Sequence, residues 1–344
     1  MGKLNGLGTR WGFMSKAKSS DNAGDALIGA VIENRFVLES VIGRGGLSTV
    51  YRASHEKAGL TVAVKILHSN YSDTTESVER FKREAAIINH LNHPNVVHMY
   101  SSGVLSGEIV KASGESEFVD SARPYLVLEC LDGFGLDDLL SKEGRLGLAA
   151  VKEVVQGVVK GLHEAHELGI IHRDIKPSNV MLVRTVGDFD KDYPGEFTRM
   201  VKLLDFGIAK CNKCHDEEKK ALTQPGYIFG SPLYMSPEQC MGRDIDHRTD
   251  IYSLGCMLYE LLVGEPPFDG ENAMHTFAMH IYEQPKSLRS HENLGHISLE
   301  LDEIVLKCLA KEPAARFGTV DEFYKAFDGA VSRILTKKEP ALEA

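Results

Sequence analysis

The sequence predicts an α+β fold of two lobes, with a small antiparallel β-rich lobe that holds one main helix and a larger, mostly helical lobe. Two features indicate this arrangement. Short β-like runs separated by turns fill the N-terminal part of the chain, and apolar stripes at helical spacing fill the remainder. The 344 residues, of which 43% are apolar and 26% charged, have the composition of an ordinary globular protein with ample material for a core.

The small lobe is expected to begin after a flexible arm. Residues 1–33 contain six glycines and several lysines but no periodic apolar pattern. Three β-like runs follow at residues 36–42, 49–53 and 61–67, and the turns between them indicate an antiparallel meander.

Apolar residues then recur at helical spacing over residues 75–90, which predicts the main helix of the small lobe. Residues 101–122 are rich in Gly, Ser and Glu, so we expect a long, mobile hairpin loop there. A further β-like run at residues 125–129 completes the small lobe.

The larger lobe is predicted from its helical patterns. A stripe of apolar residues from Val151 to Leu162 indicates a helix, and residues 251–263 are apolar on nearly every side, as in a buried central helix. Two more helical patterns lie near residues 299–309 and 320–334. The expected division is an arm at 1–33, a folded domain at 34–335 with its small lobe at about 34–130 and its larger lobe at about 134–335, and a tail at 336–344.

Composition excludes several function classes. The net charge is −10 and the sequence pI is about 5.8, so no basic surface for a nucleic-acid partner is expected. No run approaches the about 18–20 apolar residues that a membrane span requires. The N-terminus lacks the apolar core of a signal peptide, and the six scattered cysteines are typical of reduced thiols. We therefore expect a cytoplasmic protein.

Residues 172–179 (HRDIKPSN) carry the most informative motif. They place the carboxylate of Asp174, the ammonium of Lys176 and the amide of Asn179 at fixed offsets on one short turn, and a second acidic residue, Asp205, precedes Gly207 downstream. Phosphoryl transfer from a nucleotide to a hydroxyl needs such groups: a base for the hydroxyl, a cation for the moving phosphate and ligands for Mg²⁺.

A glycine-rich loop at residues 42–50 precedes this motif. Its glycines allow backbone N–H groups to approach phosphates closely. A strand follows the loop, which argues against a dinucleotide-binding turn, where a helix would follow. Lys65 then ends an apolar run at residues 62–65, on a strand whose neighbouring side chains point to the other face.

In this order, the glycine loop, the strand lysine and the two acidic motifs resemble the eukaryotic-type (Hanks-type) serine/threonine protein kinases over residues 36–327. The stretch Gly230 to Gln239 is most like the bacterial branch. The resemblance implies a bilobal protein-kinase fold, ATP and Mg²⁺ as cofactors, and transfer of the γ-phosphate to Ser or Thr hydroxyls of protein substrates. One departure is Ser48, which occupies the third glycine position of the family pattern.

The resemblance also implies roles for individual residues. The residues expected to be catalytic are Asp174 as base, Lys176 on the γ-phosphate, Lys65 on the α- and β-phosphates, and Glu84 as the partner of Lys65. The metal ligands are Asn179 and Asp205. The residues expected to bind the nucleotide are Ile42, Gly43, Arg44, Gly45, Gly46, Leu47, Ser48, Thr49, Val50, Ala63, Lys65, Glu129, Leu131 and Met181.

Residues 205–238 resemble an activation segment. Arg173 beside the catalytic Asp implies regulation by phosphorylation, with Thr223 as the first candidate and Ser231 as the second. Autophosphorylation of this segment would involve self-association of two copies. The residues expected to be structural are Glu238, which would pair with Arg316, and Asp250.

Three alternatives stay open from the sequence. Cys211, Cys214 and His215 have the spacing of a haem attachment site and could also ligate zinc. The chain could be a pseudokinase that keeps the shape and binds nucleotide as a scaffold. It could also be a small-molecule kinase of related fold, although Glu238 and Arg316 favour a protein substrate.

Overall fold

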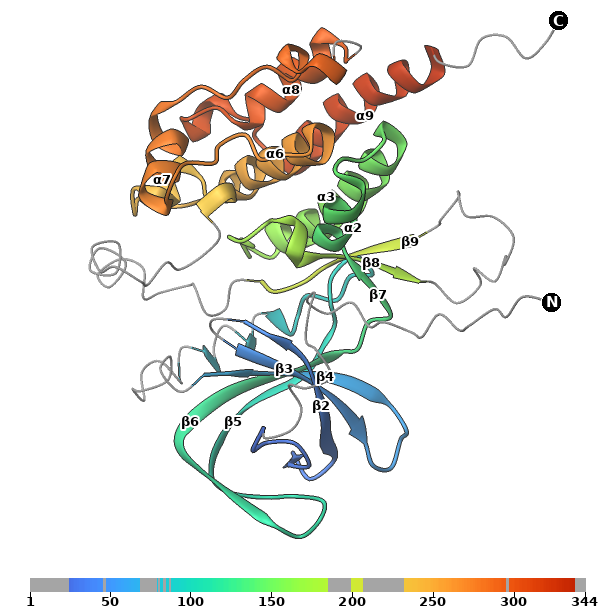
Figure 1. Ribbon diagram of the computed structural model, residues 1–344, viewed down its shortest axis with the longest axis vertical. Helices are drawn as coiled ribbons and strands as arrows, with labels where there is room; N and C mark the ends of the chain where they lie inside the picture. Colours follow the sequence, from blue (N-terminus) through green and yellow to red (C-terminus); the bar gives the residue numbers. More distant parts are fainter. Residues whose placement is uncertain are drawn as a thin grey trace, which may run out of the picture.

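The two predicted lobes are present in the computed structural model of the chain, and the predicted fold class is confirmed (Figure 1). A β-sheet forms the small lobe, and helices α2, α3 and α6–α9 lie on the other side of a second, short sheet. The residues that the structure describes are 25–45, 48–68, 79, 81–82, 85–86, 88–184, 199–206, 232–294 and 297–337.

Within the described residues, the sheet of the small lobe has six strands, and each neighbouring pair is antiparallel. Its strand order is β1-β2-β3-β4-β6-β5. The strands are β1 (Val31–Ile32), β2 (Phe36–Arg44), β3 (Ser48–His55), β4 (Thr61–Leu67), β5 (Met99–Val110) and β6 (Ser116–Glu129). The predicted meander corresponds to β2, β3 and β4.

Residues 25–32, which we call the N-terminal strap, belong to the small lobe. Strand β1 pairs with β2, and Leu27, Ala30 and Ile32 are buried in the cluster on the outer face of the sheet. The expectation of a flexible arm is therefore wrong for residues 25–33. The apolar residues of this segment follow no strict helical or alternating pattern, so only their burial against the sheet reveals that they belong to the core.

The hairpin expected at residues 101–122 is present, but the expectation that most of this stretch is a loop is wrong. Strands β5 and β6 pair along this stretch and form a long hairpin that extends away from the helical lobe (Figure 1). Gly107, with φ of 74°, lies next to a register shift in the pairing. Leu105, Ile109 and Val119 are buried in the same outer cluster as the N-terminal strap, so burial against the sheet orders a segment whose composition indicates a loop.

The main helix of the small lobe was predicted at residues 75–90, and the structure describes it only in part. Glu79, Phe81, Lys82 and Ile88 are among the helical residues that are described, and Phe81 is buried. Glu84 lies outside the described residues.

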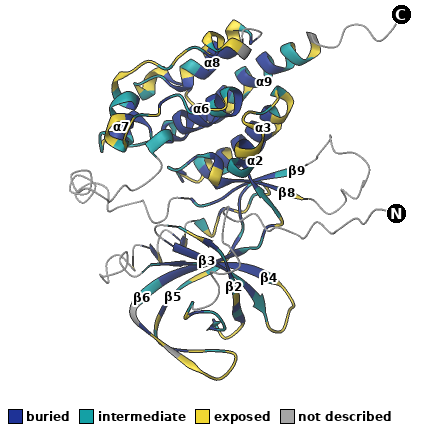
Figure 2. Cartoon of the chain, in the orientation of Figure 1, coloured by how far each residue is buried: buried dark blue, intermediate teal, exposed yellow. Residues whose placement is uncertain are grey.

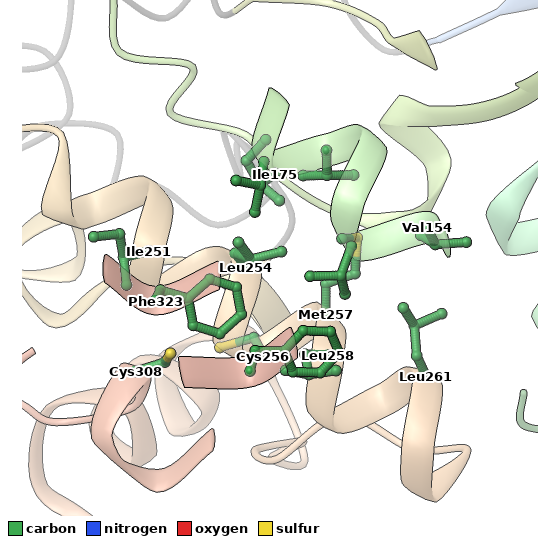
Figure 3. Packing of buried hydrophobic residues seen from close by; sticks show 14 of the residues in the cluster. Val154, Ile175, Ile251, Leu254, Cys256, Met257, Leu258, Leu261, Cys308 and Phe323 are labelled. Atoms are coloured by element: carbon green, nitrogen blue, oxygen red, sulfur yellow. The ribbon is translucent and has the colours of Figure 1, made fainter. Parts of the chain in front are cut away.

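The larger lobe packs around α6, whose residues are almost all buried (Figure 2). Figure 3 shows Ile251, Leu254 and Met257 of α6 with Cys308 of α8 and Phe323 of α9 in one apolar cluster. The helices are α2 (Leu136–Glu143), α3 (Leu148–Glu167), α5 (Pro237–Cys240), α6 (Arg248–Val263), α7 (Ala273–Tyr282), α8 (Leu299–Cys308) and α9 (Val320–Lys337).

A short antiparallel sheet lies between the two lobes and carries the sequence motifs. It has the order β7-β8-β9, with β7 (Gly133–Gly135), β8 (Val180–Arg184) and β9 (Arg199–Leu203). Leu203 of β9 donates its N–H to Asn95 O at 2.8 Å, and Val97 donates its N–H to Leu203 O at 2.8 Å. These backbone bonds attach the small lobe to the strand that leads to Asp205.

Among the described residues, no helix combines the length and the apolar character needed to cross a membrane. The four described cysteines are free thiols, and Cys240, Cys256 and Cys308 are buried. Burial raises the pKa of each of these three thiols.

A buried ion pair joins α5 to the segment before α9. Arg316 Nη1 and Nη2 donate to the two carboxylate oxygens of Glu238 at 2.7 and 2.8 Å, and Thr249 Oγ1 donates to Glu238 at 2.7 Å. Three backbone carbonyls accept the remaining Arg316 hydrogen bonds. Burial would raise the pKa of Glu238, but the hydrogen bonds from Arg316 lower it below its ordinary value. The expected Glu238–Arg316 pair is therefore present and fully bonded.

Removing one partner of this pair leaves the other charge buried without compensation. We expect Arg316→Ala to lower the free energy of unfolding by about 3–5 kcal/mol. Chemical denaturation of the purified variant measures this. The matched control is Glu300→Gln, which breaks the exposed Arg333–Glu300 pair and should change stability by no more than about 0.5 kcal/mol. Equal effects of the two variants would contradict the structural role.

Candidate active site

His172 anchors the turn that carries the motif at residues 172–179. Its ring is fully buried: Nε2 bonds Leu204 O at 2.8 Å, and Nδ1 accepts the backbone N–H of Asp174 at 3.3 Å. Burial lowers the pKa of His172 below its ordinary value, so the ring is neutral. It also packs against Phe206, with ring centroids 4.5 Å apart. The neutral ring thus fixes the turn to the segment that carries Asp205.

Asp250, at the start of α6, binds the backbone of the same turn. Its carboxylate accepts the backbone N–H of His172 at 2.9 Å and of Arg173 at 2.8 Å, and it bonds His166 Nε2 at 2.8 Å. Burial would raise the pKa of Asp250, but the hydrogen bond and charge of His166 and the His172 N–H hold it below its ordinary value. The predicted structural role of Asp250 corresponds to this arrangement.

Arg173 adopts a left-handed backbone conformation, with φ of 66°. Such a conformation is costly for a residue with a side chain and persists where neighbours fix it. Here Asp250 binds its N–H, and Gln239 Nε2 of α5 donates to its carbonyl at 3.0 Å. Helix α5 is therefore bonded directly to the turn at residues 172–179.

Three predicted catalytic and metal-binding side chains meet at the turn. Lys176 Nζ lies 3.0 Å from Asp174 Oδ2. Asn179 Nδ2 donates to Asp174 O at 2.7 Å and to Asp174 Oδ2 at 3.0 Å. The short helix η2 (Pro177–Asn179) sets this spacing, since its Pro177 fixes the backbone after Lys176. A hydroxyl placed at Asp174 would have a carboxylate and an ammonium within reach.

Lys65 and Asp205 approach from opposite lobes. Lys65 Nζ of β4 forms an ion pair with Asp205 Oδ1 at 2.7 Å. Asp205 has φ of 51°, so the chain turns sharply after β9 and brings the carboxylate towards the small lobe. The expected partner of Lys65, Glu84, lies outside the described residues.

The donor set fits Mg²⁺. Asn179 uses its amide nitrogen for Asp174, and this leaves its Oδ1 as a neutral oxygen ligand. The Oδ1 atom of Asp205 pairs with Lys65, and among the described residues no cationic side chain pairs with its Oδ2 atom. Hard oxygen ligands from a carboxylate and an amide are those that Mg²⁺ prefers, together with phosphate oxygens.

The predicted adenine-binding residues lie in one apolar cluster between the lobes. Val50, Ala63, Leu131 and Met181 are buried in it, and Ile42 packs against it. These side chains come from β2, β3, β4 and β8 and from the connection between the lobes, so the sequence motifs converge in space. A flat apolar ring would find aliphatic contacts on both faces here.

Glu129, expected to supply a backbone contact, has its side chain engaged elsewhere. Its carboxylate pairs with Lys202 of β9 and accepts the backbone N–H of His98 at 2.7 Å. Its own N–H donates to His98 O at 2.9 Å. Lys202 was missed from the sequence because an alternating strand position alone does not identify a buried lysine.

The glycine-rich loop is described at its two ends. Gly43 and Arg44 complete β2, Gly45 follows it, and Ser48 and Thr49 begin β3 with little exposed surface. Gly46 and Leu47 lie outside the described residues. The Arg44 side chain points to the outer face of the sheet, where it bonds Asp25 Oδ2 at 2.6 Å, so only its backbone is left for the nucleotide side.

A cavity of about 280 Å³ lies directly beside Lys176. Asp137 of α2 and Glu260 of α6 line it, and Tyr234 donates its hydroxyl to Glu260 at 2.5 Å. Burial raises the pKa of Glu260, and the nearby Asp137 charge adds to this. The sequence did not indicate this acidic wall, because its members come from separate helices.

The regulatory candidates Thr223 and Ser231 lie outside the described residues. The same is true of Cys211, Cys214 and His215. Within the described residues, no group of three or more His, Cys, Asp or Glu side chains could hold a metal ion.

Comparison with known proteins gives consistent matches. The protein kinase domain family matches residues 36–327. The serine/threonine-protein kinase PknB of Mycobacterium leprae is 36% identical over 292 residues, which cover 85% of this chain and 42% of that protein. A probable serine/threonine-protein kinase of Streptomyces coelicolor is 36% identical over 289 residues, which cover 84% of this chain and 38% of that protein. The chain thus spans about two fifths of the length of these curated relatives.

Among solved structures, the crystal structure of the PknI kinase domain of Mycobacterium tuberculosis matches with a TM-score of 0.62 and 24% identity. The match covers 88% of this chain and 98% of that chain. At this identity the likeness supports the fold alone.

The role of Asp250 leads to a prediction at this site. We expect Asp250→Asn to lower the rate of phosphate transfer by about 10–100-fold. The carboxylate accepts the backbone N–H groups of His172 and Arg173 with one oxygen each, whereas the Asn amide has only one oxygen that can accept. The fold lowers the pKa of Asp250 below 3.8, so its contribution to stability is complete above pH 3.8 and is lost as the pH falls further. Because Asn does not titrate, the free energy of unfolding of Asp250→Asn should fall less than that of the wild type as the pH drops below 3.8.

Labelled-ATP kinetics and denaturation between pH 2 and pH 7 measure both effects. The matched control is Asp246→Asn, since Asp246 bonds Arg248 near the start of the same helix without contacting the turn. An Asp250→Asn rate within about twofold of wild type would show that the turn does not depend on this carboxylate.

Proposed function

The chain belongs to the protein kinase family, and on this premise we propose that it transfers the γ-phosphate of ATP, in the presence of Mg²⁺, to Ser or Thr hydroxyls of protein substrates. The names of its curated relatives support the serine/threonine class. One observation carries the proposal: Lys65 meets Asp205, and Asp174 meets Lys176 and Asn179, all at 2.7–3.0 Å.

Each of these residues has a separate role in the proposed reaction. Asp174 orients the substrate hydroxyl and accepts its proton, a role that contributes about 10²–10⁴-fold in rate. Lys176, already within 3.0 Å of Asp174, compensates the charge of the moving phosphate. Lys65 binds the α- and β-phosphates, and Glu84 is proposed as its partner.

Asn179 and Asp205 would hold Mg²⁺. The ion supplies charge neutralisation at the β- and γ-phosphate oxygens. The apolar cluster of Val50, Ala63 and Met181 orients the adenine, and the connection at Glu129 and Leu131 offers it backbone hydrogen bonds. Binding and orientation of this kind provide much of the rate gain in phosphoryl transfer.

The acidic cavity beside Lys176 supports a protein substrate. Asp137, Tyr234 and Glu260 line a space of about 280 Å³ beside Lys176, and we propose that a side chain of a protein substrate enters it. The proposed location is cytoplasmic, in keeping with the free thiols of the described cysteines. Autophosphorylation would require two copies to associate, at least transiently.

The chemistry is tested by Asp174→Asn. We expect this variant to keep its fold and its ATP affinity while the transfer rate falls by about 10²-fold or more, because the base is lost and the shape is retained. Labelled ATP with Mg²⁺, followed by mapping of labelled residues by mass spectrometry, measures the transfer. The matched control is Asp244→Asn, an acidic residue after α5, which should transfer phosphate at the wild-type rate. Nucleotide binding without transfer in the wild-type protein would favour the pseudokinase instead.

Regulation is proposed at Thr223, with Ser231 as the second candidate. A phosphate at residue 223 adds a charge of about −1.5 to −2 and would order the activation segment through a basic pocket that includes Arg173. We expect autophosphorylated protein to be faster than phosphatase-treated protein, and Thr223→Ala to abolish that difference. Ser231→Ala serves as the comparison and should keep it. Equal rates of the two wild-type forms would exclude this switch.

A further inference from the structure

The N-terminal strap contacts the glycine-rich loop through one carboxylate. Asp25 Oδ2 accepts a hydrogen bond from Arg44 Nη2 at 2.6 Å, and the Tyr51 hydroxyl donates to the same carboxylate at 3.0 and 3.1 Å. The backbone N–H of Leu27 donates to Asp25 Oδ1 at 3.1 Å. The Asp25 side chain is only 9% exposed. These four contacts are charge-assisted and connect the strap, β2 and β3.

Asp25 contacts the glycine-rich loop at its base. Arg44 is the last residue of β2 and pairs with Thr49, the second residue of β3. Directly beyond it, the N–H of Gly45 donates to Ser48 O at 2.8 Å. The side chains of Arg44 and Tyr51 lie on the outer face of the sheet, whereas Val50 belongs to the apolar cluster between the lobes. Asp25 therefore restrains the loop from the side opposite the nucleotide.

The charges around Asp25 explain why a carboxylate lies there. A cavity of about 400 Å³ opens beside it, and Arg44, Arg123 and His68 line that cavity. The Nε of Arg123 is buried and has no hydrogen-bond partner among the described residues. Asp25 is the one acidic residue among the described residues that line this cavity. Its carboxylate therefore offsets part of the positive charge that Arg44 and Arg123 bring to this cavity.

We propose that Asp25 is a positioning residue for the glycine-rich loop and that the N-terminal strap, which precedes the matched family region, belongs to the nucleotide-binding machinery. The inference rests on the proposed function for its kinetic part. If Asp25 restrains the loop before ATP binds, binding costs less conformational entropy. This lowers the free energy of the ATP complex and of its transition state by the same amount. The effect should therefore fall on the KM for ATP rather than on kcat.

The kinetic test uses the 344-residue chain with Asp25→Ala or Asp25→Asn. Each should raise the KM for ATP by about threefold to tenfold, the range expected for loss of a charge-assisted contact, with kcat changed less than about twofold. The matched control is Glu39→Ala, which removes the carboxylate of the Arg52–Glu39 pair on the same two strands, away from the loop. Its KM should equal that of the wild type. An unchanged KM in both Asp25 variants, or an equal rise in the control, would overturn the proposal.

Formate provides a second readout that a merely structural role would not affect. In Asp25→Ala, the vacated space adjoins the basic cavity, so added sodium formate should lower the KM for ATP towards the wild-type value, and sodium chloride at the same concentration should not. In Asp25→Asn, the amide still fills the position, and formate should have no effect. Equal responses of the two variants to formate would show that the carboxylate is not the acting group.

Hydrogen exchange separates this inference from the proposed function. In nucleotide-free protein, amides of residues 43–50 should exchange faster in Asp25→Ala than in wild type, whereas residues 133–143 should be unchanged. This result does not depend on any catalytic activity, so it stands even if the chain transfers no phosphate. Identical exchange of residues 43–50 in both proteins would remove the basis of the proposal.

Discussion

The Asp250 carboxylate lies without exposed surface at the start of α6, in a position where an unpaired charge would be very costly. Three donors surround it, two from the backbone of the catalytic turn and one from His166. The bonds therefore act in both directions: they keep the charge ionised, and the charge keeps Arg173 in its left-handed conformation. Because Asp174 follows directly, a residue of the central helix holds the backbone that carries the Asp174 carboxylate.

The charged side chains of the candidate active site pair with one another. Lys65 pairs with Asp205, and Lys176 pairs with Asp174. A metal and a phosphate chain bring opposite charges in similar number, so each side chain can exchange one partner for another without being left unpaired. Sites of this kind are already organised before the ligand arrives, and little reorganisation accompanies the reaction.

Sequence reasoning worked where function is encoded locally. Residues 172–179 fold as one turn, so their spacing in the chain predicts their spacing in space, and the Glu238–Arg316 pair followed from the family resemblance. It failed where burial decides structure. The hairpin of β5 and β6 has the composition of a loop, and Lys202 of β9 meets Glu129 of β6 although the two strands belong to different sheets. No window of neighbouring residues contains such information.

The N-terminal boundary of the domain is another feature that sequence reasoning could not locate. A family pattern is defined by residue types that recur, and it begins here at residue 36. The physical unit begins earlier, because Ala30 and Ile32 fill the outer face of a sheet that would otherwise expose Leu38 and Val64 to water. That face is one layer away from the apolar cluster that we propose as the adenine site. A segment that closes the outer face therefore also stiffens the inner one, and conformational order at the nucleotide site extends to residues that no catalytic motif includes.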